Sequence, residues 1–187
     1  MISGRELTEY IVFKFKRVGS KQLQKIAYLS ELEYMKKYGE RLSDLTFKKY
    51  YYGPYSGEIY EIKEESENIH IQTENANLYT YKPASIKDGA KIDIPSDISG
   101  FLDSIFVKFK DKTGADLEKI ADNTEPYIDT ETIGDNIDLD GYVEYYKDLL
   151  SDDFWKNAEE KDKQNEENHV YGKLIVKSKE DLDRIFG

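Results

Sequence analysis

The sequence of 187 residues predicts an α+β fold: a mainly helical single domain with a small β-hairpin and a C-terminal strand-helix appendage. Apolar residues recur at helical spacing in four separate segments, and the stretch near 68–82 holds β-favouring residues around a turn. The length suits one domain with a sizeable core. We place the main domain over residues 1–152, followed by a polar linker helix and a short strand-helix tail over 153–187.

The N-terminus is predicted to form two helices. Ser3 and Glu6 have capping-box spacing ahead of a helix over residues 4–17. A second helix follows over residues 21–38 and ends before Gly39, a residue that commonly stops helices. Apolar residues cover more than one face of the second helix, which is typical of a helix at the centre of a domain.

The middle of the chain is predicted to be extended, and then to form the hairpin. Residues 42–52 are rich in β-favouring side chains. Two strands are expected over 68–73 and 78–82, because turn-forming residues at 75–77 lie between them. Residues 83–95 are predicted to be a loop.

Three further helices are predicted in the C-terminal half. Residues 96–109 carry the most regular apolar stripe in the chain, and a short helix is expected over 115–122. An irregular acidic loop is predicted between Pro126 and Gly134. The last helix of the main domain is expected over residues 139–150, with Asp138 as its N-cap.

Composition excludes several classes of function. Acidic residues outnumber basic ones 38 to 27, giving a net charge of −11, which argues against binding nucleic acid or an anionic membrane. Cysteine is absent, which excludes thiol catalysis and disulfides. The chain has only two histidines, too few for a site with several histidine ligands. We therefore expect no cofactor and no metal. No targeting segment is visible, so we expect a cytoplasmic protein.

Tyrosine is the unusual residue, with 16 copies against 8 of phenylalanine. Its apolar ring and polar tip suit protein interfaces. The densest group is Tyr50, Tyr51, Tyr52 and Tyr55. In an extended segment at least one face of this group is available for binding; the alternative is that the rings cover the central helix.

Two other patterns are weighed as sites. Asp122, Glu125 and Asp129 lie close in sequence and are candidates for acid/base chemistry in a small hydrolase. No nucleophile accompanies them, and a chain with 38 acidic residues forms such clusters by chance. His70 alternates with two isoleucines in a predicted strand and is expected to face solvent, and His169 lies in the polar linker.

The segment from Asn136 to Glu144 is similar to the first part of a calcium-binding EF-hand loop. Asn136, Asp138 and Asp140 occupy ligand positions. The final ligand position holds Lys147, whose charge repels calcium. The alternative is a loop in which Asp138 caps the following helix.

From Lys21 to Glu61, a lysine- and leucine-containing helix leads to an extended segment that ends in Tyr-Gly-Pro. The residues that form this pattern are Lys21, Leu23, Lys25, Ile26, Tyr28, Leu29, Gly39, Leu42, Tyr52, Gly53 and Pro54. The pattern resembles the signature of the Panacea (SocA/GepA-like) antitoxin domain family. Family members often have a His and then Pro-Trp near 122–127, where this chain has no His and has Tyr127 in place of Trp.

The resemblance implies a protein-binding antitoxin of a toxin-antitoxin system, which is not an enzyme. Such domains neutralise a toxin by direct contact or deliver it to a protease. We expect the partner to be a toxin with a basic face, attracted by the net charge of −11. The residues expected to contact it are Tyr50, Tyr51, Tyr52, Pro54 and Tyr55.

Overall fold

The computed structural model describes residues 1–76 and 79–151, and it is a mainly helical α+β fold as predicted. In chain order the elements are α1 (Gly4–Phe15), β1 (Arg17–Val18), α2 (Ser20–Tyr38), α3 (Gly57–Glu65), β2 (Ile69–Ile71), β3 (Glu74–Ala76), β4 (Tyr79–Tyr81), β5 (Ala84–Ile86), α4 (Ser96–Phe109), α5 (Gly114–Asp122), α6 (Glu125–Asp129) and α7 (Leu139–Leu150). The predicted strand-helix tail lies outside the described residues. Within the described residues, no helix combines the length and apolarity needed to cross a membrane.

The start of α1 and the end of α2 form where the sequence predicts them, but α1 ends at Phe15 and not at Arg17, which belongs to β1. The Ser3 hydroxyl accepts a hydrogen bond from the Glu6 amide at 3.2 Å, and the Glu6 carboxylate accepts one from the Ser3 amide at 2.7 Å. This reciprocal pair satisfies two of the amides that a helix start leaves free. Gly39 ends α2 in the left-handed conformation, with φ at 64°, and its amide donates to the Met35 carbonyl.

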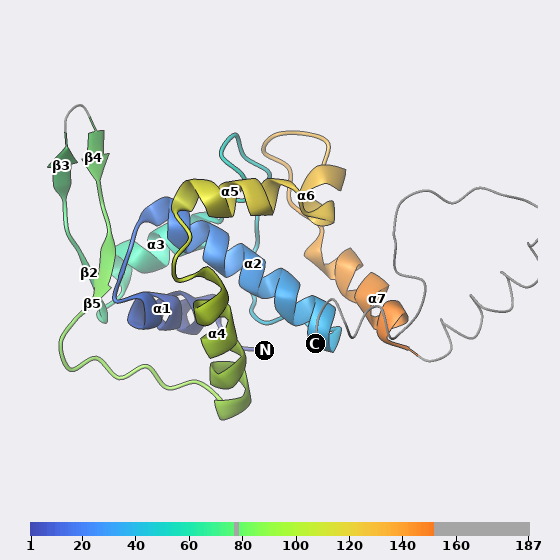
Figure 1. The fold of residues 1–187 in the computed structure, drawn as a ribbon, viewed down its shortest axis with the longest axis horizontal. Coiled ribbons are helices and arrows are strands. Elements are labelled where there is room, and N and C mark those ends of the chain that lie inside the picture. Colours follow the sequence, from blue (N-terminus) through green and yellow to red (C-terminus); the bar gives the residue numbers. More distant parts are fainter. Residues whose placement is uncertain (77–78, 152–187) are drawn as a thin grey trace, which may run out of the picture.

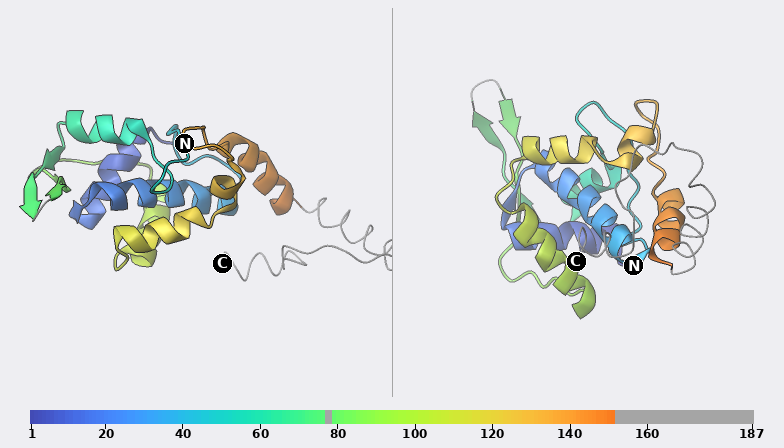
Figure 2. Two further views of the ribbon diagram at one scale, coloured as in Figure 1. Left: turned by 90° about the horizontal axis from the view of Figure 1, so that it is seen from above. Right: turned by 45° about the vertical axis from the view of Figure 1, so that its right-hand side comes forward.

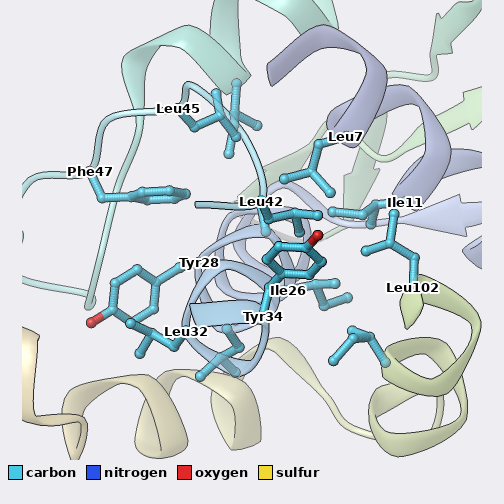
Figure 3. Packing of buried hydrophobic residues seen from close by; sticks show 14 of the residues in the cluster. Leu7, Ile11, Ile26, Tyr28, Leu32, Tyr34, Leu42, Leu45, Phe47 and Leu102 are labelled. Carbon is cyan, nitrogen blue, oxygen red and sulfur yellow. The ribbon is translucent and has the colours of Figure 1, made fainter. Parts of the chain in front are cut away.

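Helix α2 is the central element. It passes between α1, α4, α5 and α7 and contacts all four (Figure 1). Its residues from Leu23 to Leu32 are buried, polar ones included, which confirms the prediction from its apolar pattern. Figure 3 shows its side chains packing against Leu7 and Ile11 of α1 and against Phe47 of the segment that follows α2.

The predicted strands exist, but the predicted pairing between them is wrong. Strand β2 pairs antiparallel with β5, with Ile69 opposite Ile86, and β3 pairs with β4. Residues 75–76, expected in the turn, belong to β3, and the expected loop after 83 begins with β5. The ladder continues this far because Ala84 of β5 is fully buried and β1 adds a further strand beside it.

The β3–β4 arm extends beyond the helices, at the end of the molecule away from α7 (Figures 1 and 2). The arm therefore stands apart from the site described below.

The C-terminal helices match the predictions with one addition. The stripe of α4 is buried against the core, and the Asp138 carboxylate caps α7 by accepting from the Gly141 amide at 2.9 Å. The loop predicted from Pro126 instead begins with the one-turn helix α6. Its start is favoured because proline lacks the amide hydrogen that a first helical turn leaves unpaired.

Candidate functional site

The predicted tyrosine cluster forms a closed turn, which we call the tyrosine turn (residues 50–55). Lys48 and Tyr55 bracket it with two backbone hydrogen bonds, at 2.8 and 3.0 Å, and the Gly53 amide donates to the Tyr50 carbonyl at 3.1 Å. These bonds join backbone atoms only. The shape of the turn therefore does not depend on its tyrosine side chains.

Gly53 is required in the turn for two reasons. Its φ of 81° lies in the left-handed region, where side chains are strained. A Cβ at this position would lie 2.6 Å from the Asp122 Oδ1 atom and 2.9 Å from the Lys25 Cε atom. The Lys25 amine donates to the Pro54 carbonyl at 2.7 Å, so α2 supports the turn from beneath.

Two further anchors hold the turn to the helices. The Tyr127 hydroxyl of α6 donates to the Tyr50 carbonyl at 2.8 Å. On the other side, Gln24 of α2 exchanges two hydrogen bonds with the backbone of Ser56, both at 2.8 Å. The turn between α2 and α3 is thus fixed beside α5 and α6 (Figure 1).

The structure places four of the five predicted contact residues at the surface. Tyr51 is 74% exposed and Tyr52 is 65% exposed, with Tyr50 and Tyr55 less so. Pro54 is buried beneath them. The ring that packs on the central helix is instead Phe47, whose centroid lies 5.4 Å from that of Tyr28.

A hollow of about 260 Å³ lies between the tyrosine turn, the start of α2 and α3, and we call it the tyrosine–lysine hollow. Leu23 and Ile59, both fully buried, contribute to its apolar lining. Aromatic side chains form much of the rest: Tyr50, Tyr52, Tyr55 and Tyr60. The hollow extends the exposed tyrosine surface inward.

The charged residues that line this hollow are all lysines: Lys21, Lys25 and Lys63. The Lys21 amine bonds the Glu118 carboxylate at 2.6 Å and lies 5.0 Å from the centroid of the Tyr52 ring. Cations at this distance are attracted to the face of an aromatic ring. The lining itself is therefore cationic on a strongly acidic chain, while Glu118 just outside it partly offsets the charge of Lys21.

The two deeper lysines have lowered pKa values. The Lys63 amine donates to the Ser20 hydroxyl at 2.9 Å, and burial lowers its pKa. Burial lowers the pKa of Lys25 to about 8, although the charges of Asp122 and Glu118 oppose the shift. A negative charge brought into the hollow would raise both pKa values and so favour the charged state of these amines.

A second hollow, of about 410 Å³, lies between α6, the loop that follows it and α7. We call it the acidic hollow, because four carboxylates line it: Asp129, Glu131, Asp135 and Asp138. Lys49 runs along its edge, and its amide donates to the Asp135 carbonyl at 2.9 Å. Tyr142 also lines it and donates to Asp129; burial and then that bond raise the pKa of the tyrosine.

The carboxylates proposed for a hydrolase do not converge. Asp122 lies against Gly53 and Lys25, and burial raises its pKa. Asp129 lines the acidic hollow instead, and accepts from Tyr142. Within the described part of the chain, no three His, Asp or Glu side chains gather as metal ligands.

The EF-hand-like segment has other partners. Asp138 caps α7, Asp140 pairs with Arg41 at 2.8 Å, and Lys147 pairs with Glu144 at 2.9 Å. The segment therefore forms the helix cap that was the alternative to a calcium site. His70 is exposed on β2 as predicted, and His169 lies outside the described residues.

A mainly helical scaffold that carries an exposed, fixed turn is an architecture suited to recognition. The family model for the SocA-like antitoxin, Panacea domain, matches residues 23–127, which is more than half of the chain. The chain therefore belongs to the Panacea antitoxin-like family. The match runs from Leu23, in the lining of the tyrosine–lysine hollow, to Tyr127, which holds the turn. No curated protein and no solved structure matches the chain.

Sequence reasoning missed the lysines as part of the site. Lys21 and Lys25 are four residues apart on a predicted helix, so they share a face, and that spacing was available as a signal. Lys63 gave no comparable signal, because its position in the hollow depends on how α3 packs. Gln24 was also missed, since a single sequence does not show which polar residues of a central helix are buried.

Proposed function

We propose that this protein is an antitoxin-type binding protein that silences a toxin in the cytoplasm. It does so by holding the toxin in direct contact or by delivering it to a protease, and it performs no catalysis itself. The family supports an antitoxin-type role. The single observation that carries the choice of surface is the tyrosine turn, exposed at its tip and fixed at its base.

Fixed aromatic side chains suit such a contact for energetic reasons. Tyrosine brings a large apolar area and a polar tip, and it loses little conformational freedom on binding. A turn closed by backbone bonds adds little further ordering cost when the partner arrives. We therefore assign the contact to Tyr50, Tyr51, Tyr52 and Tyr55, with Pro54 shaping the turn from beneath.

The charge distribution supports a toxin with a basic face. A net charge of −11 attracts such a partner and raises the rate of encounter. Lys49, next to the turn, bonds the backbone of Asp135 in the acidic hollow, whose four carboxylates would meet basic side chains of the partner. The hydrolase alternative is not proposed, since Asp122 and Asp129 face different neighbours.

The test begins with capture of the partner by the tagged full chain in its native host. The captured protein is then expressed alone and together with the antitoxin candidate. We expect arrest of growth in the first case and recovery in the second. The amount of toxin separates the two mechanisms: direct contact leaves it unchanged, while delivery to a protease reduces it.

The double variant Tyr51→Ser, Tyr52→Ser tests the surface. We expect it to lose both capture and growth recovery while keeping the thermal stability of the wild type. Val107→Ser on α4 is a matched control, because Val107 is 68% exposed and lies outside the turn. Failure to recover any growth-arresting partner would overturn the function, and full recovery by the double variant would overturn the surface.

A further inference from the structure

The tyrosine–lysine hollow differs from the surface around it in size and in charge. Its volume of about 260 Å³ falls below the range of about 300–1,000 Å³ that is usual for small-molecule sites. A hollow of this size suits one inserted side chain. Binding hot spots commonly have this form, in which an anchor residue from one protein fills a desolvated pocket on the other.

The lining determines which anchor fits. Leu23, Ile59 and the tyrosine rings offer an apolar surface, which favours an aliphatic or aromatic side chain. An arginine or lysine anchor is disfavoured, because all three charged residues of the lining are lysines and none is acidic. The favoured charge next to the anchor is therefore negative.

We propose that the hollow binds an extended segment of the partner protein, which inserts an apolar or aromatic side chain and places an adjacent carboxylate between Lys21 and Lys63. This inference rests on the proposed function, since it describes how the partner engages the same surface. Lys21 lies at the exposed rim, and Lys63 lies deeper, bonded to Ser20 beside it. The carboxylate would form a charge-assisted bond with the Lys63 amine and share the Lys21 amine with Glu118, which already bonds it at 2.6 Å.

The net charge of the chain favours a protein segment over a polyanion as the occupant. The chain as a whole carries −11, so nucleic acid and other dense anions are repelled. A single carboxylate on an otherwise neutral or basic segment avoids this repulsion. The partner would thus combine a basic face with one acidic-apolar anchor, and the anchor would fix its register on the tyrosine turn.

Four capped hexapeptides test the proposal on the full chain: Ser-Gly-Phe-Glu-Gly-Ser and the same peptide with Phe-Lys, Ala-Glu or Ala-Lys at its centre. Each is titrated to about 5 mM while amide chemical shifts are followed. We expect the Phe-Glu peptide to shift residues of the hollow and to bind about tenfold more tightly than the other three. Equal binding of Phe-Lys, or no shift in the hollow with Phe-Glu, would overturn the proposal.

Substitutions give a second, independent test. Lys21→Gln and Lys63→Met should each weaken binding of the Phe-Glu peptide several-fold. Lys108→Gln is the matched control: Lys108 bonds Glu33 at 2.6 Å, as Lys21 bonds Glu118, and the two lysine side chains are 53% and 45% exposed. A loss with the control as large as with Lys21→Gln would contradict a specific role.

The outcomes distinguish this inference from the proposed function. If a toxin is captured through Tyr51 and Tyr52 but the peptides do not discriminate, the function stands and the anchor proposal fails. If the Phe-Glu peptide binds selectively but no toxin is recovered, the hollow is an anchor site for a partner of another kind.

Discussion

The two hollows near the tyrosine turn have no lining residue in common and differ in nearly every physical property. The tyrosine–lysine hollow is aromatic, contains three lysines and is set over the core residues Leu23 and Ile59. The acidic hollow is polar and lined by four carboxylates. Tyr50 lines the first hollow, and the adjacent Lys49 bonds the backbone of Asp135, which lines the second. The comparison shows that net charge describes only the average of a surface. The charged residues that line one hollow are all lysines, although the chain carries a net charge of −11.

Gly53→Ala should have the largest effect, because Gly53 lines the tyrosine–lysine hollow and has no room for a side chain. A side chain at this φ is strained, and its Cβ would press on Asp122 and Lys25. We expect a loss of about 2 kcal/mol or more in the free energy of unfolding, or roughly 4–8 °C in Tm. Thermal unfolding measures it. The control is Gly57→Ala, where a Cβ meets no atom within 4 Å, and an equal loss there would contradict the account.

Lys25 should give the tyrosine–lysine hollow a response to pH. Its pKa is about 8 when folded, against 10.5 for the free side chain. Between these values the unfolded chain binds more protons than the folded one, so the lysine's contribution to stability rises with pH. The free energy of unfolding of the wild type, relative to that of Lys25→Met, should rise by up to about 1 kcal/mol per pH unit between pH 8 and 10.5.

Urea unfolding of both proteins at about pH 7.5 and 9.5 measures the gain. Ionisation of the tyrosines affects both proteins and cancels in the difference. Lys49→Met is the structural counterpart on the acidic side, since the Lys49 amine donates to the Thr130 carbonyl at 2.6 Å, much as Lys25 donates to Pro54. If the difference in unfolding free energy between the wild type and Lys25→Met does not grow with pH, burial of a charged Lys25 is ruled out.

A third prediction removes one tyrosine hydroxyl near each hollow. Tyr127→Phe removes the hydrogen bond to the Tyr50 carbonyl, and Tyr142→Phe removes the bond to Asp129. Each should cost about 1 kcal/mol. Only Tyr127→Phe should also change the amide chemical shifts of the tyrosine turn. Shifts of the turn in Tyr142→Phe would mean that the two hollows are coupled.

The smallest effect is expected from neutralising the acidic hollow. Glu131→Gln with Asp135→Asn should slow association with the toxin about two- to fivefold at low salt and leave dissociation nearly unchanged. High salt should remove the difference, because screening shortens the range of exposed charges. Stopped-flow or surface-based kinetics measures both rates. A change confined to dissociation would indicate direct contact of these carboxylates with the partner.

Much of the fold followed from local patterns. The capping box at Ser3, the stop at Gly39 and the cap at Asp138 all formed as predicted, because each depends on residues within a few positions of one another. The pairing of β2 with β5 was not predicted. Strand pairing depends on which positions reach the core, and Ala84, a small residue in an expected loop, gave no indication of its full burial.

The site was predictable only in part. The exposed tyrosines were identified from composition and from the Tyr-Gly-Pro turn. The buried polar residues of α2 were not, since Gln24 and Lys25 resemble surface positions in a sequence. They are buried because each meets a backbone group of the segment after residue 53. That meeting is a property of packing between elements distant in the chain.

The backbone closure of the tyrosine turn has a consequence for engineering. The bonds of Lys48, Tyr55 and Gly53, and that from Tyr127, all end on main-chain atoms of the turn. The side chains at Tyr51 and Tyr52 are therefore free to be exchanged at little cost to the frame. A combinatorial library at these two positions would sample new specificities on an unchanged scaffold, in the way that a grafted loop does on an antibody framework.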